Sequence, residues 1–413
     1  MKVLISAYAC EPHKGSEPGV GWNTIVELSK TCELWVITRA NNRENIEKNK
    51  NIFKLKNINF IYVDLPKWLS FWKKGRRGVQ LYYYLWQVYI YFIAKRLHTI
   101  NNYDLIHHVT FVKYWSPSFL SLLPVPFIWG PVGGGESAPR TFWRNLGCKG
   151  YIYEFVRTIT RWCFEQDPFV KYTARKSALC LATSNETATR LTKIGAKNVQ
   201  IFSQVGLLSQ ELSDLKNENN NQSATLRVVS MGNLLPFKGY HLGLKAMSKV
   251  KDENIEYWII GDGPERDKLE ELAKELKIDD KVKFLGRLPR KEALCRLKQC
   301  HIFLHTCLHE SGGNVCSEAM AASLPVVCLD SGGPGLQVIQ GTGFKIKPSN
   351  PNQVIEDIAT KISMLIKDRD LLNSMGLQAR IRAVEEYNWG NKGDFYIEMY
   401  EEVINSCRDV NKK

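Results

Sequence analysis

Two glutamates, Glu310 and Glu318, lie in one short segment with seven residues between them. A turn of small residues fills the interval, and a helix-forming run carries Glu318. Strand-like apolar segments at 301–307 and 324–328 flank the pair. The segment therefore predicts a strand, a glycine turn, a helix and a second strand. This arrangement places one carboxylate at the mouth of a crevice and the other beside helix N–H groups that can hold a pyrophosphate.

A second glycine turn begins after the strand expected near 227–230. It contains Gly232, Lys238 and Gly239, just before a helix-forming run. Lys238 offers a positive charge to a phosphate, and Gly239 lets the backbone approach it closely. A solvated lysine in an ordinary βα loop is the alternative.

Further glycine turns follow three other expected strands, at 261–264, 286–287 and 332–335. Ligands of α/β proteins bind at the carboxyl ends of parallel strands, which is where these turns would lie. The backbone near Arg287 is a candidate contact for a nucleobase edge. A plain structural turn is the alternative for each.

Strand-like runs alternate with helical patterns along the whole chain. The runs lie at 3–7, 33–38, 59–63, 105–109, 126–129 and 178–182 in the first half, and at 226–230, 256–260, 282–285, 302–305 and 325–329 in the second. This alternation predicts an α/β fold with doubly wound parallel sheets. The polar segment 211–224 indicates a linker between two domains.

The composition is that of a globular protein, since 44% of the 413 residues are hydrophobic and 24% are charged. The eleven cysteines form no C-x-x-C pair and no cluster at zinc-ligand spacing, which favours reduced thiols in a cytosolic protein. The N-terminus enters a short strand and lacks the longer apolar run of a signal peptide. We therefore expect a cytoplasmic protein.

The net positive charge of +14 arises from the first half of the chain. Residues 1–200 contain 28 Lys and Arg against 13 Asp and Glu, whereas residues 201–413 contain 28 against 29. A basic surface on one half indicates an anionic partner, such as a phospholipid layer or a phosphorylated substrate. Solvated lysines without a partner are the alternative. The lack of a recognition module argues against nucleic acid.

Residues 67–96 combine aromatic side chains with the basic cluster Lys73, Lys74, Arg76 and Arg77. The apolar run after the cluster is shorter than the ~20 residues of a membrane-spanning helix. Tyr and Trp beside Lys and Arg are typical of the headgroup level of a bilayer. Two interpretations stay open, an anionic membrane surface as partner or a buried helix packed on the sheet. The Arg- and aromatic-rich segment 142–162 favours membrane contact.

Taken in order, these motifs resemble the family-4 retaining glycosyltransferases of GT-B architecture. The resemblance is carried by Gly232…Lys238-Gly239, Gly261-Asp262-Gly263-Pro264, Phe284-Leu285-Gly286 and Glu310-x7-Glu318. The glycine-rich loop 15–21, the run 103–107 and a closing helix after Trp389 also fit. The resemblance implies two Rossmann-like domains facing a central cleft. Residues 1–205 would bind the acceptor, 206–385 the nucleotide-sugar donor, and 386–413 would pack back toward the first domain.

The resemblance also implies roles for individual residues. Lys238 matches the lysine on the donor phosphates, Glu310 the catalytic glutamate near the transferred sugar, and Glu318 the glutamate on the ribose. The implied donor-binding residues are Gly232, Asn233, Lys238, Gly263, Arg287, Gly313, Asn314, Val315 and Glu318. Neither a metal nor another cofactor is implied. Positive charge and amide dipoles would speed departure of the diphosphate, while Glu310 would steady an oxocarbenium-like sugar.

The chain departs from the family pattern at four positions. Ser323-Leu324 stands where the family has a glycine before Pro-Val, and the glutamate usual after the later Gly-Gly loop is missing around Leu336-Gln337. Asn233 stands where the family usually has an arginine beside the phosphates. The family's cleft histidine often falls at the position of Val109, so His107 and His108 are the catalytic candidates, with ordinary strand histidines as the alternative. The expected acceptor-side residues are five glycines in two loops, Gly15, Gly19, Gly21, Gly134 and Gly135.

We therefore expect a retaining hexosyltransferase that moves a hexose from a nucleoside diphosphate sugar to a lipid-linked or growing glycan acceptor. It would serve cell-surface polysaccharide biosynthesis at the inner face of the cytoplasmic membrane. Two alternatives stay open. A GT-B epimerase would release an altered free sugar, and a catalytically silent relative would bind nucleotide or glycan without turnover.

Overall fold

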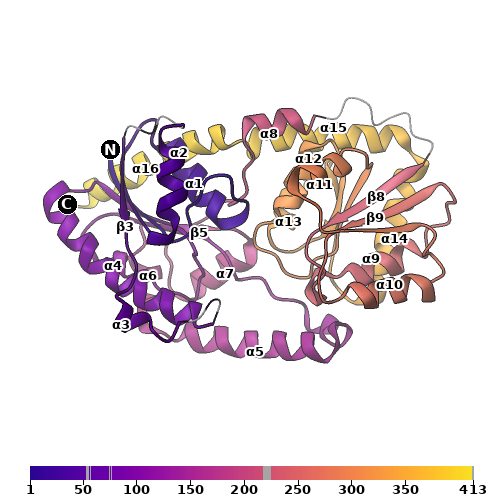
Figure 1. The fold of residues 1–413 in the computed structure, drawn as a ribbon, viewed down its shortest axis with the longest axis horizontal. Helices are drawn as coiled ribbons and strands as arrows, with labels where there is room; N and C mark the ends of the chain where they lie inside the picture. The colour runs from indigo at the N-terminus through magenta and orange to yellow at the C-terminus, as the bar shows by residue number, and fades with distance from the viewer. Residues whose placement is uncertain (53–54, 56, 74, 76, 217–224, 412–413) are drawn as a thin grey trace. The chain divides into compact units, whose positions relative to one another are not determined.

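A computed structural model describes the chain except residues 53–54, 56, 74, 76, 217–224 and 412–413. The chain forms two compact units (Figure 1). Unit 1 comprises Met1–Gly135, Ile159–Gln204 and Trp389–Lys413, and unit 2 comprises Glu136–Thr158 and Val205–Asn388. Two of the four residues in the predicted basic cluster, and most of the predicted linker, lie outside the described residues.

Unit 1 contains a seven-stranded sheet in the order β3-β2-β1-β4-β5-β6-β7, with every pairing parallel. Its strands are β1 (Lys2–Ala7), β2 (Glu33–Thr38), β3 (Ile58–Tyr62), β4 (Leu105–Thr110), β5 (Phe127–Val132), β6 (Leu179–Ala182) and β7 (Val199–Ile201). Its helices are α1 (Ser16–Leu28), α2 (Arg43–Lys50), α3 (Lys67–Ser70), α4 (Val79–Asn101), α6 (Pro168–Lys176), α7 (Asn185–Lys193) and α16 (Trp389–Asn411), with 3-10 turns η1 (Ala40–Asn42) and η2 (Phe119–Leu122).

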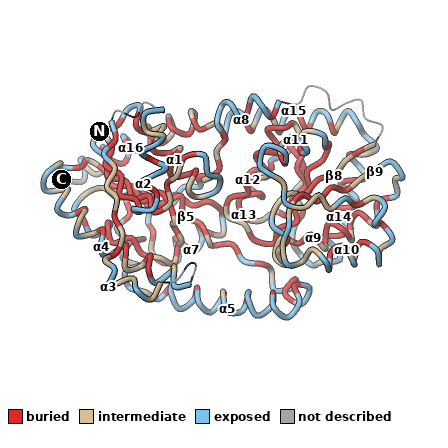
Figure 2. Tube along the Cα trace, in the orientation of Figure 1, coloured by how far each residue is buried: buried red, intermediate tan, exposed pale blue. Residues whose placement is uncertain are grey.

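Alternate residues of each strand in unit 1 pack against different helices, because side chains of a strand point to opposite faces. Leu4 joins a core that contains Trp86 of α4. Its neighbour Ile5 joins a second core with Trp22 of α1 and Tyr400 of α16. The sheet is therefore buried on both faces, as Figure 2 shows.

Unit 2 contains a six-stranded parallel sheet in the order β10-β9-β8-β11-β12-β13. Its strands are β8 (Leu226–Met231), β9 (Ile255–Ile260), β10 (Val282–Gly286), β11 (Ile302–His305), β12 (Val326–Leu329) and β13 (Gly343–Ile346). Its helices are α8 (Ser209–Asp214), α9 (Tyr240–Met247), α10 (Arg266–Glu275), α11 (Arg290–Leu297), α12 (Asn314–Ala321), α13 (Gly332–Gln337), α14 (Pro351–Lys367) and α15 (Arg369–Glu386), with 3-10 turns η3 (Arg140–Leu146) and η5 (Pro236–Lys238).

The same alternation builds the two cores of unit 2. Val228 packs in a core with residues of α9, α10 and α14, and the neighbouring Val229 packs in a core with residues of α8, α11, α12 and α15. Phe142 of η3 also belongs to the first core, which explains why the segment 136–158 clusters with unit 2. The remaining helix, α5 (Gly147–Glu165), begins among residues of unit 2 and ends among residues of unit 1.

All predicted strands are present, with ends shifted by no more than three residues. Two strands were missed, β7 and β13, which lie at the edges of the sheets. Both are short, and β13 begins with a glycine and contains a lysine, so neither forms an apolar run. The predicted doubly wound α/β fold is confirmed for both units. Among the described residues, no helix combines the length and apolar character needed to cross a bilayer.

The strand order of each sheet fixes where a crevice forms. In unit 1, successive strands are added outward from β1 toward β3 on one side and from β4 toward β7 on the other. In unit 2, they are added from β8 toward β10 and from β11 toward β13. Ligands of doubly wound sheets bind outside the carboxyl ends of the strands at such a switch point. The loops after β8 and β11 are those that carry Lys238 and Glu310.

Candidate active site

The switch point of unit 2 brings Lys238 and Glu310 into direct contact. Nζ of Lys238 lies 2.7 Å from Oε2 of Glu310. Nε2 of His305, the last residue of β11, lies 2.9 Å from the same carboxylate oxygen. The two loops are also joined by their backbones, since Leu308 N–H donates to the carbonyl of Phe237 at 2.9 Å. Two predicted site residues therefore share one site, together with a histidine that had no predicted role.

The surroundings keep this pair ionised. Burial raises the pKa of the Glu310 carboxyl, but the hydrogen bond from His305 and the charge of Lys238 outweigh burial and hold that pKa well below its usual range. Burial lowers the pKa of Lys238, yet the charge and hydrogen bond of the Glu310 carboxylate help to raise that pKa overall. Both side chains keep about a fifth of their surface exposed, 18% for Lys238 and 22% for Glu310. A charged ligand can therefore reach them.

His305, Cys307 and Glu310 form a group whose ligand atoms lie within 4.8 Å of one another. The ammonium of Lys238 already contacts the Glu310 oxygen that a metal ion would need. Burial also raises the pKa of the Cys307 thiol to about 12, so this side chain is protonated at neutral pH. Metals bind the thiolate rather than the thiol. The chemistry of the group fits a hydrogen-bonded ion pair better than a metal centre.

The glycine turn between the two glutamates ends in a helix start. Gly313 has φ +81, and a Cβ there would lie 2.9 Å from Cγ of Pro334. Glycine is needed at this position because both the backbone conformation and the space exclude a side chain. Asn314 and Val315 form the first turn of α12 and are partly exposed. First-turn N–H groups have no partner within the helix, so this end of α12 can bind an anion.

Glu318 lies on α12 and is only 3% exposed. Its Oε1 lies 2.6 Å from Nη1 of Arg290, and Nη2 of Arg290 lies 2.9 Å from Glu211. Burial raises the pKa of Glu318, and the charge of Arg290 opposes this effect. Arg290 was not predicted as a site residue, because it opens a helix 28 positions earlier and no motif marks it. The contact of Glu318 with a ribose remains a prediction.

The remaining predicted donor residues lie at the carboxyl ends of β8, β9 and β10. A Cβ on Gly261 would lie 1.9 Å from the carbonyl oxygen of Gly232, and one on Gly263 would lie 2.6 Å from that of Leu234. The loops after β8 and β9 are therefore in backbone contact, which explains their glycines. Asn233 and Arg287 are exposed at this edge. The structure brings these residues to one edge of the sheet.

The segment 136–158 holds the glutamate loop from a second direction. Nε2 of His309 lies 2.7 Å from Oε1 of Glu154, and both side chains are at least nine-tenths buried. The ring of His309 stacks on Phe237, with centroids 4.5 Å apart. Ser311 donates a 2.6 Å hydrogen bond to Glu136. The neighbours of Lys238 and Glu310 are thus held by two distant carboxylates. Glu154 is 155 positions from His309, and Glu136 is 175 positions from Ser311, so no local sequence pattern signals these contacts.

The two histidines predicted as catalytic are fully buried within unit 1. Nδ1 of His107 lies 2.5 Å from the hydroxyl of Tyr400, and its Nε2 lies 2.7 Å from the carbonyl of Gly130. Nε2 of His108 lies 2.8 Å from the hydroxyl of Tyr83. Burial lowers the pKa of His107 to about 4 and that of His108 to about 3. Both are neutral packing residues in this structure, which matches the alternative of ordinary strand histidines.

Two of the glycines predicted on the acceptor side lie in a helix rather than a loop. Helix α1 begins at Ser16, so Gly19 and Gly21 fall within it and only Gly15 precedes it. A Cβ on Gly19 would lie 2.2 Å from the carbonyl of Lys14, and one on Gly21 would lie 2.3 Å from that of Ala9. These glycines let the β1–α1 loop pass close to the helix. The expected loop position of Gly19 and Gly21 was therefore wrong, and their contact with an acceptor stays a prediction.

Gly134 and Gly135 do lie in a loop, after β5. Gly134 has φ +91 and faces Trp115. Gly135 is fixed by three hydrogen bonds. Its N–H donates to Thr187 at 3.0 Å, and its carbonyl accepts from Arg161 at 2.6 Å and Arg190 at 3.0 Å. This loop is therefore held in place, whereas a flexible loop was the alternative.

A carboxylate that was not predicted lies at the switch point of unit 1. Oε1 of Glu17, on the first turn of α1, accepts a 2.9 Å hydrogen bond from the N–H of Phe111 after β4. Burial raises the pKa of Glu17, and Lys113 opposes this effect. Glu17 thus follows β1, the counterpart of β8 in unit 2, and reaches the loop after β4, the counterpart of β11.

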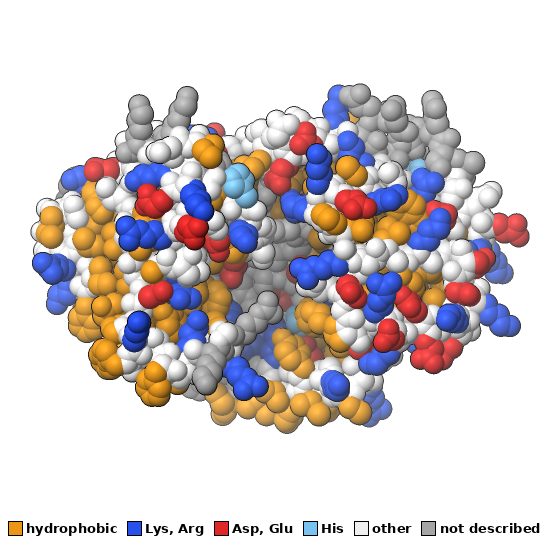
Figure 3. All heavy atoms as spheres, in the orientation of Figure 1, with side chains coloured by type: hydrophobic (Ala, Val, Ile, Leu, Met, Phe, Trp, Pro, Cys, Tyr) orange, Lys and Arg blue, Asp and Glu red, His pale blue; other side chains and the backbone are white. Residues whose placement is uncertain are grey.

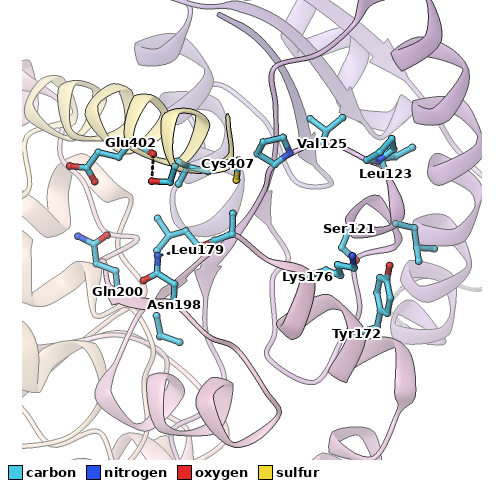
Figure 4. A pocket seen from close by; sticks show the side chains of 17 residues that line it. Ser121, Leu123, Val125, Tyr172, Lys176, Leu179, Asn198, Gln200, Glu402 and Cys407 are labelled. Carbon is cyan, nitrogen blue, oxygen red and sulfur yellow. Dashed lines mark hydrogen bonds between the residues drawn. The ribbon is translucent and has the colours of Figure 1, made fainter. Parts of the chain in front are cut away.

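Unit 1 also contains an open cavity of ≈ 990 Å³, shown in Figure 4. Its lining comes from the chain before β5, the first residues of β6 and β7, and the end of α16. These are the amino ends of the strands, opposite the switch-point edge. The cavity therefore lies away from the residues with predicted chemical roles.

Residues 213–382 match a family model described as "Glycosyl transferases group 1". The chain is 37% identical over 107 residues to the lipopolysaccharide core biosynthesis glycosyltransferase LpsD of Rhizobium meliloti, covering 26% of this chain and 30% of that protein. It is 27% identical over 224 residues to the putative colanic acid biosynthesis glycosyltransferase WcaL of Escherichia coli, covering 52% and 54%. The chain thus spans about half or less of these relatives.

The structure resembles that of Anabaena Alr3699/HepE in complex with UDP and glucose, with a TM-score of 0.59 and 18% identity over 97% of this chain and 100% of the other. At this identity the likeness establishes the fold, which is GT-B with two parallel-sheet α/β domains. The glycosyl transferases group 1 match lies within unit 2, the unit that carries Lys238, Glu310 and Glu318.

Proposed function

We propose that this protein is a retaining hexosyltransferase of the E-x7-E type. It moves a hexose from a nucleoside diphosphate sugar to a lipid-linked or growing glycan acceptor. The observation that carries the proposal is the contact of Lys238 with Glu310 at the switch point of unit 2. That unit lies largely within the glycosyl transferases group 1 match.

The charges at this site suit departure of a diphosphate. The bond between the anomeric carbon and the diphosphate oxygen breaks, and the electron pair leaves with the diphosphate. Lys238 and the N-terminus of α12 supply positive charge and N–H donors, which stabilise charge that develops on the leaving group. Both are fixed before the reaction, since η5 and α12 are held by the contacts described above.

In this reaction, Glu310 lies beside the sugar, on which positive charge develops. Its low pKa keeps it a carboxylate at neutral pH, so it can stabilise an oxocarbenium-like sugar. The acceptor hydroxyl attacks the anomeric carbon from the side that the diphosphate leaves. Its proton passes to the departing diphosphate oxygen, and the anomeric configuration is retained.

No metal has a part in the proposed reaction, because Lys238 provides the cation at the leaving group. The contact of its ammonium with the Glu310 oxygen supports this assignment. The acceptor is proposed to be glycan or lipid-linked because the two relatives are described as enzymes of lipopolysaccharide core and colanic acid biosynthesis. We place the enzyme in the cytoplasm, at the inner face of the cytoplasmic membrane. Lys73, Lys74, Arg76 and Arg77 would contact anionic lipid there.

Nucleotide titration followed by a donor screen tests the proposal. UDP, GDP and ADP are titrated calorimetrically into the full chain, and the preferred nucleotide fixes which nucleoside diphosphate sugars are screened. We expect one nucleotide to bind and one of its sugars to be transferred to an acceptor with retained configuration at the anomeric carbon. Release of an altered free sugar without acceptor would establish the epimerase instead. Nucleotide binding without turnover of any donor would establish the silent relative.

A further inference from the structure

Helix α5 turns its acidic side chains inward and large apolar side chains outward. Its two acidic residues, Glu154 and Glu165, are 1% and 4% exposed. Large apolar side chains that are 40% or more exposed are Tyr151, Ile152, Tyr153, Phe155, Val156, Ile159, Trp162 and Phe164. Figure 3 shows hydrophobic side chains along the lower edge, where α5 runs in Figure 1. An ordinary surface helix has the opposite polarity.

Five of these side chains form one continuous stripe. Ile152, Phe155, Val156, Ile159 and Trp162 recur at intervals of three and four residues. This spacing places them on a single face of a helix. Scattered exposed apolar residues are normal on a protein surface, but a contiguous stripe marks an interaction site.

The inward face is fixed by buried hydrogen bonds, so the stripe is not a misplaced core. In unit 2, Glu154 holds His309. In unit 1, Glu165 accepts hydrogen bonds of 2.6 Å from both Tyr114 and Arg190. Turning the helix to bury its apolar face would expose or separate these charged groups. A buried charge without its partner is costly, so the outward orientation is the stable one.

The surface near the end of α5 in unit 1 has the same character. The hydroxyl of Tyr84 on α4 lies 3.2 Å from Asp167, which follows α5 directly. Trp68 on α3 and Phe71 directly after it are 72% and 78% exposed. Lys73 and Arg77 lie in the same stretch, and Arg77 is exposed. Unpartnered aromatics therefore occur beside basic residues, as in proteins that contact the headgroup layer.

We propose that α5 is an interfacial anchor that lies parallel to the plane of an anionic phospholipid bilayer, with the stripe Ile152–Phe155–Val156–Ile159–Trp162 inserted into it. The occupant is lipid rather than protein because the stripe lies in a half of the chain with a large excess of basic residues. The helix also offers no exposed carboxylate to repel lipid phosphates. Interfacial helices bury their apolar face about 5–10 Å deep without crossing the membrane.

This anchor is distinct from the basic cluster named above and does not depend on the proposed reaction. The two surfaces differ in how salt affects them. Binding through Lys73, Lys74, Arg76 and Arg77 alone weakens strongly at high ionic strength, because exposed charges are screened. Binding through the α5 stripe persists, because apolar burial is not screened.

Vesicle co-sedimentation of the full chain tests the anchor. The vesicles contain equal parts of phosphatidylcholine and phosphatidylglycerol, and a second set contains phosphatidylcholine alone. The face variant carries Ile152→Ser, Phe155→Ser and Ile159→Ser. The matched control carries Met364→Ser, Leu377→Ser and Ile381→Ser, which are apolar residues on α14 and α15 with 40–57% exposure. Circular dichroism confirms that both variants fold.

We expect the wild type and the control to bind the anionic vesicles and the face variant to bind at least about tenfold more weakly. The proposal would be overturned if the face variant and the control bound the anionic vesicles equally well. So would a wild type that remains in the supernatant. Light scattering without vesicles provides a further check, since a dimer that only the face variant loses would assign the stripe to a second copy of the chain.

Discussion

Nζ of Lys238 lies 2.7 Å from Oε2 of Glu310, although 72 positions separate the two residues in the chain. The contact joins the loops after β8 and β11 at the switch point of one sheet. A cation and a carboxylate are therefore held at hydrogen-bond distance. In the proposed reaction, the donor diphosphate competes with Glu310 for the Lys238 ammonium.

This competition predicts opposite effects of two substitutions on nucleotide affinity. Lys238→Met should weaken UDP or the preferred nucleotide by roughly tenfold or more, because a charge-assisted contact is lost. Glu310→Gln should leave that affinity unchanged or raise it, since the ammonium is released, while transfer falls by at least about a hundredfold. Calorimetry and a transfer assay measure the two effects. Undiminished transfer by a folded Glu310→Gln protein would show that the catalytic assignment is wrong.

The same pair makes a prediction about stability. Each single substitution leaves one partly buried charge without its partner and should cost about 3 kcal/mol of unfolding free energy. The double variant Lys238→Met with Glu310→Gln should lose less than the sum of the two. Urea unfolding of the four proteins gives the coupling energy. Additive losses would mean that the contact contributes nothing to the folded state.

Glu318 can be assigned to the ribose by comparing two ligands. If Glu318 binds the ribose hydroxyls, Glu318→Gln should weaken nucleoside diphosphate but leave inorganic pyrophosphate unchanged. Lys238→Met should weaken both ligands, which makes it the control for a phosphate contact. Arg290→Met, which removes the partner of Glu318, tests whether this ion pair orients the carboxylate. Equal losses for both ligands in Glu318→Gln would place Glu318 at the phosphates.

The contact of His309 with Glu154 predicts a positioning role. Glu154→Gln replaces the carboxylate with an amide of the same shape, and His309→Gln removes the ring that stacks on Phe237. Both should lower kcat while leaving the KM for donor less affected, because Lys238 and Glu310 lose their fixed geometry. Each should cost about 1–3 kcal/mol of stability. An unchanged kcat in these variants would show that the contact of His309 with Glu154 serves packing alone.

Because His107 and His108 are buried and neutral, we expect the folded protein to lose stability in mild acid. The pKa of His107 is about 4 in the folded protein and about 6.5 in an unfolded chain. As the pH falls below about 6.5, the unfolded state takes up a proton that the folded state refuses, so stability is complete above this pH and declines toward pH 4. The decline should be roughly 1.4 kcal/mol per pH unit for each such histidine.

Urea titrations at pH 7, 6 and 5 measure this slope. His107→Asn should reduce the slope by roughly 1.4 kcal/mol per pH unit, whereas substitution of the exposed His13 by Gln should keep the wild-type slope. A slope that His107→Asn does not change would mean that other groups govern the acid response. His108, with a pKa of about 3, should act in the same direction as His107.

The sequence by itself determined the two parallel sheets and most of their strands, because strand and helix periodicity are local properties. It also placed Lys238 and Glu310 in strand-end loops and Glu318 on the helix that follows, since glycine turns mark the strand ends. Helix ends were less certain, as the early start of α1 shows. The edge strands β7 and β13 were missed because short, polar edge segments carry no apolar run.

Only the tertiary structure decided which side chains meet. Glu310 pairs with Lys238 and Glu318 with Arg290 because the strand order brings distant loops to one edge. The burial of His107 depends on α16, which lies almost 300 positions later and packs on its strand. The sequence favoured membrane contact for segment 142–162, but only the structure showed which face of α5 points outward, since apolar residues give the same pattern in a core or on a surface. Burial is a property of the packed chain, because it depends on what the rest of the sequence places against each residue.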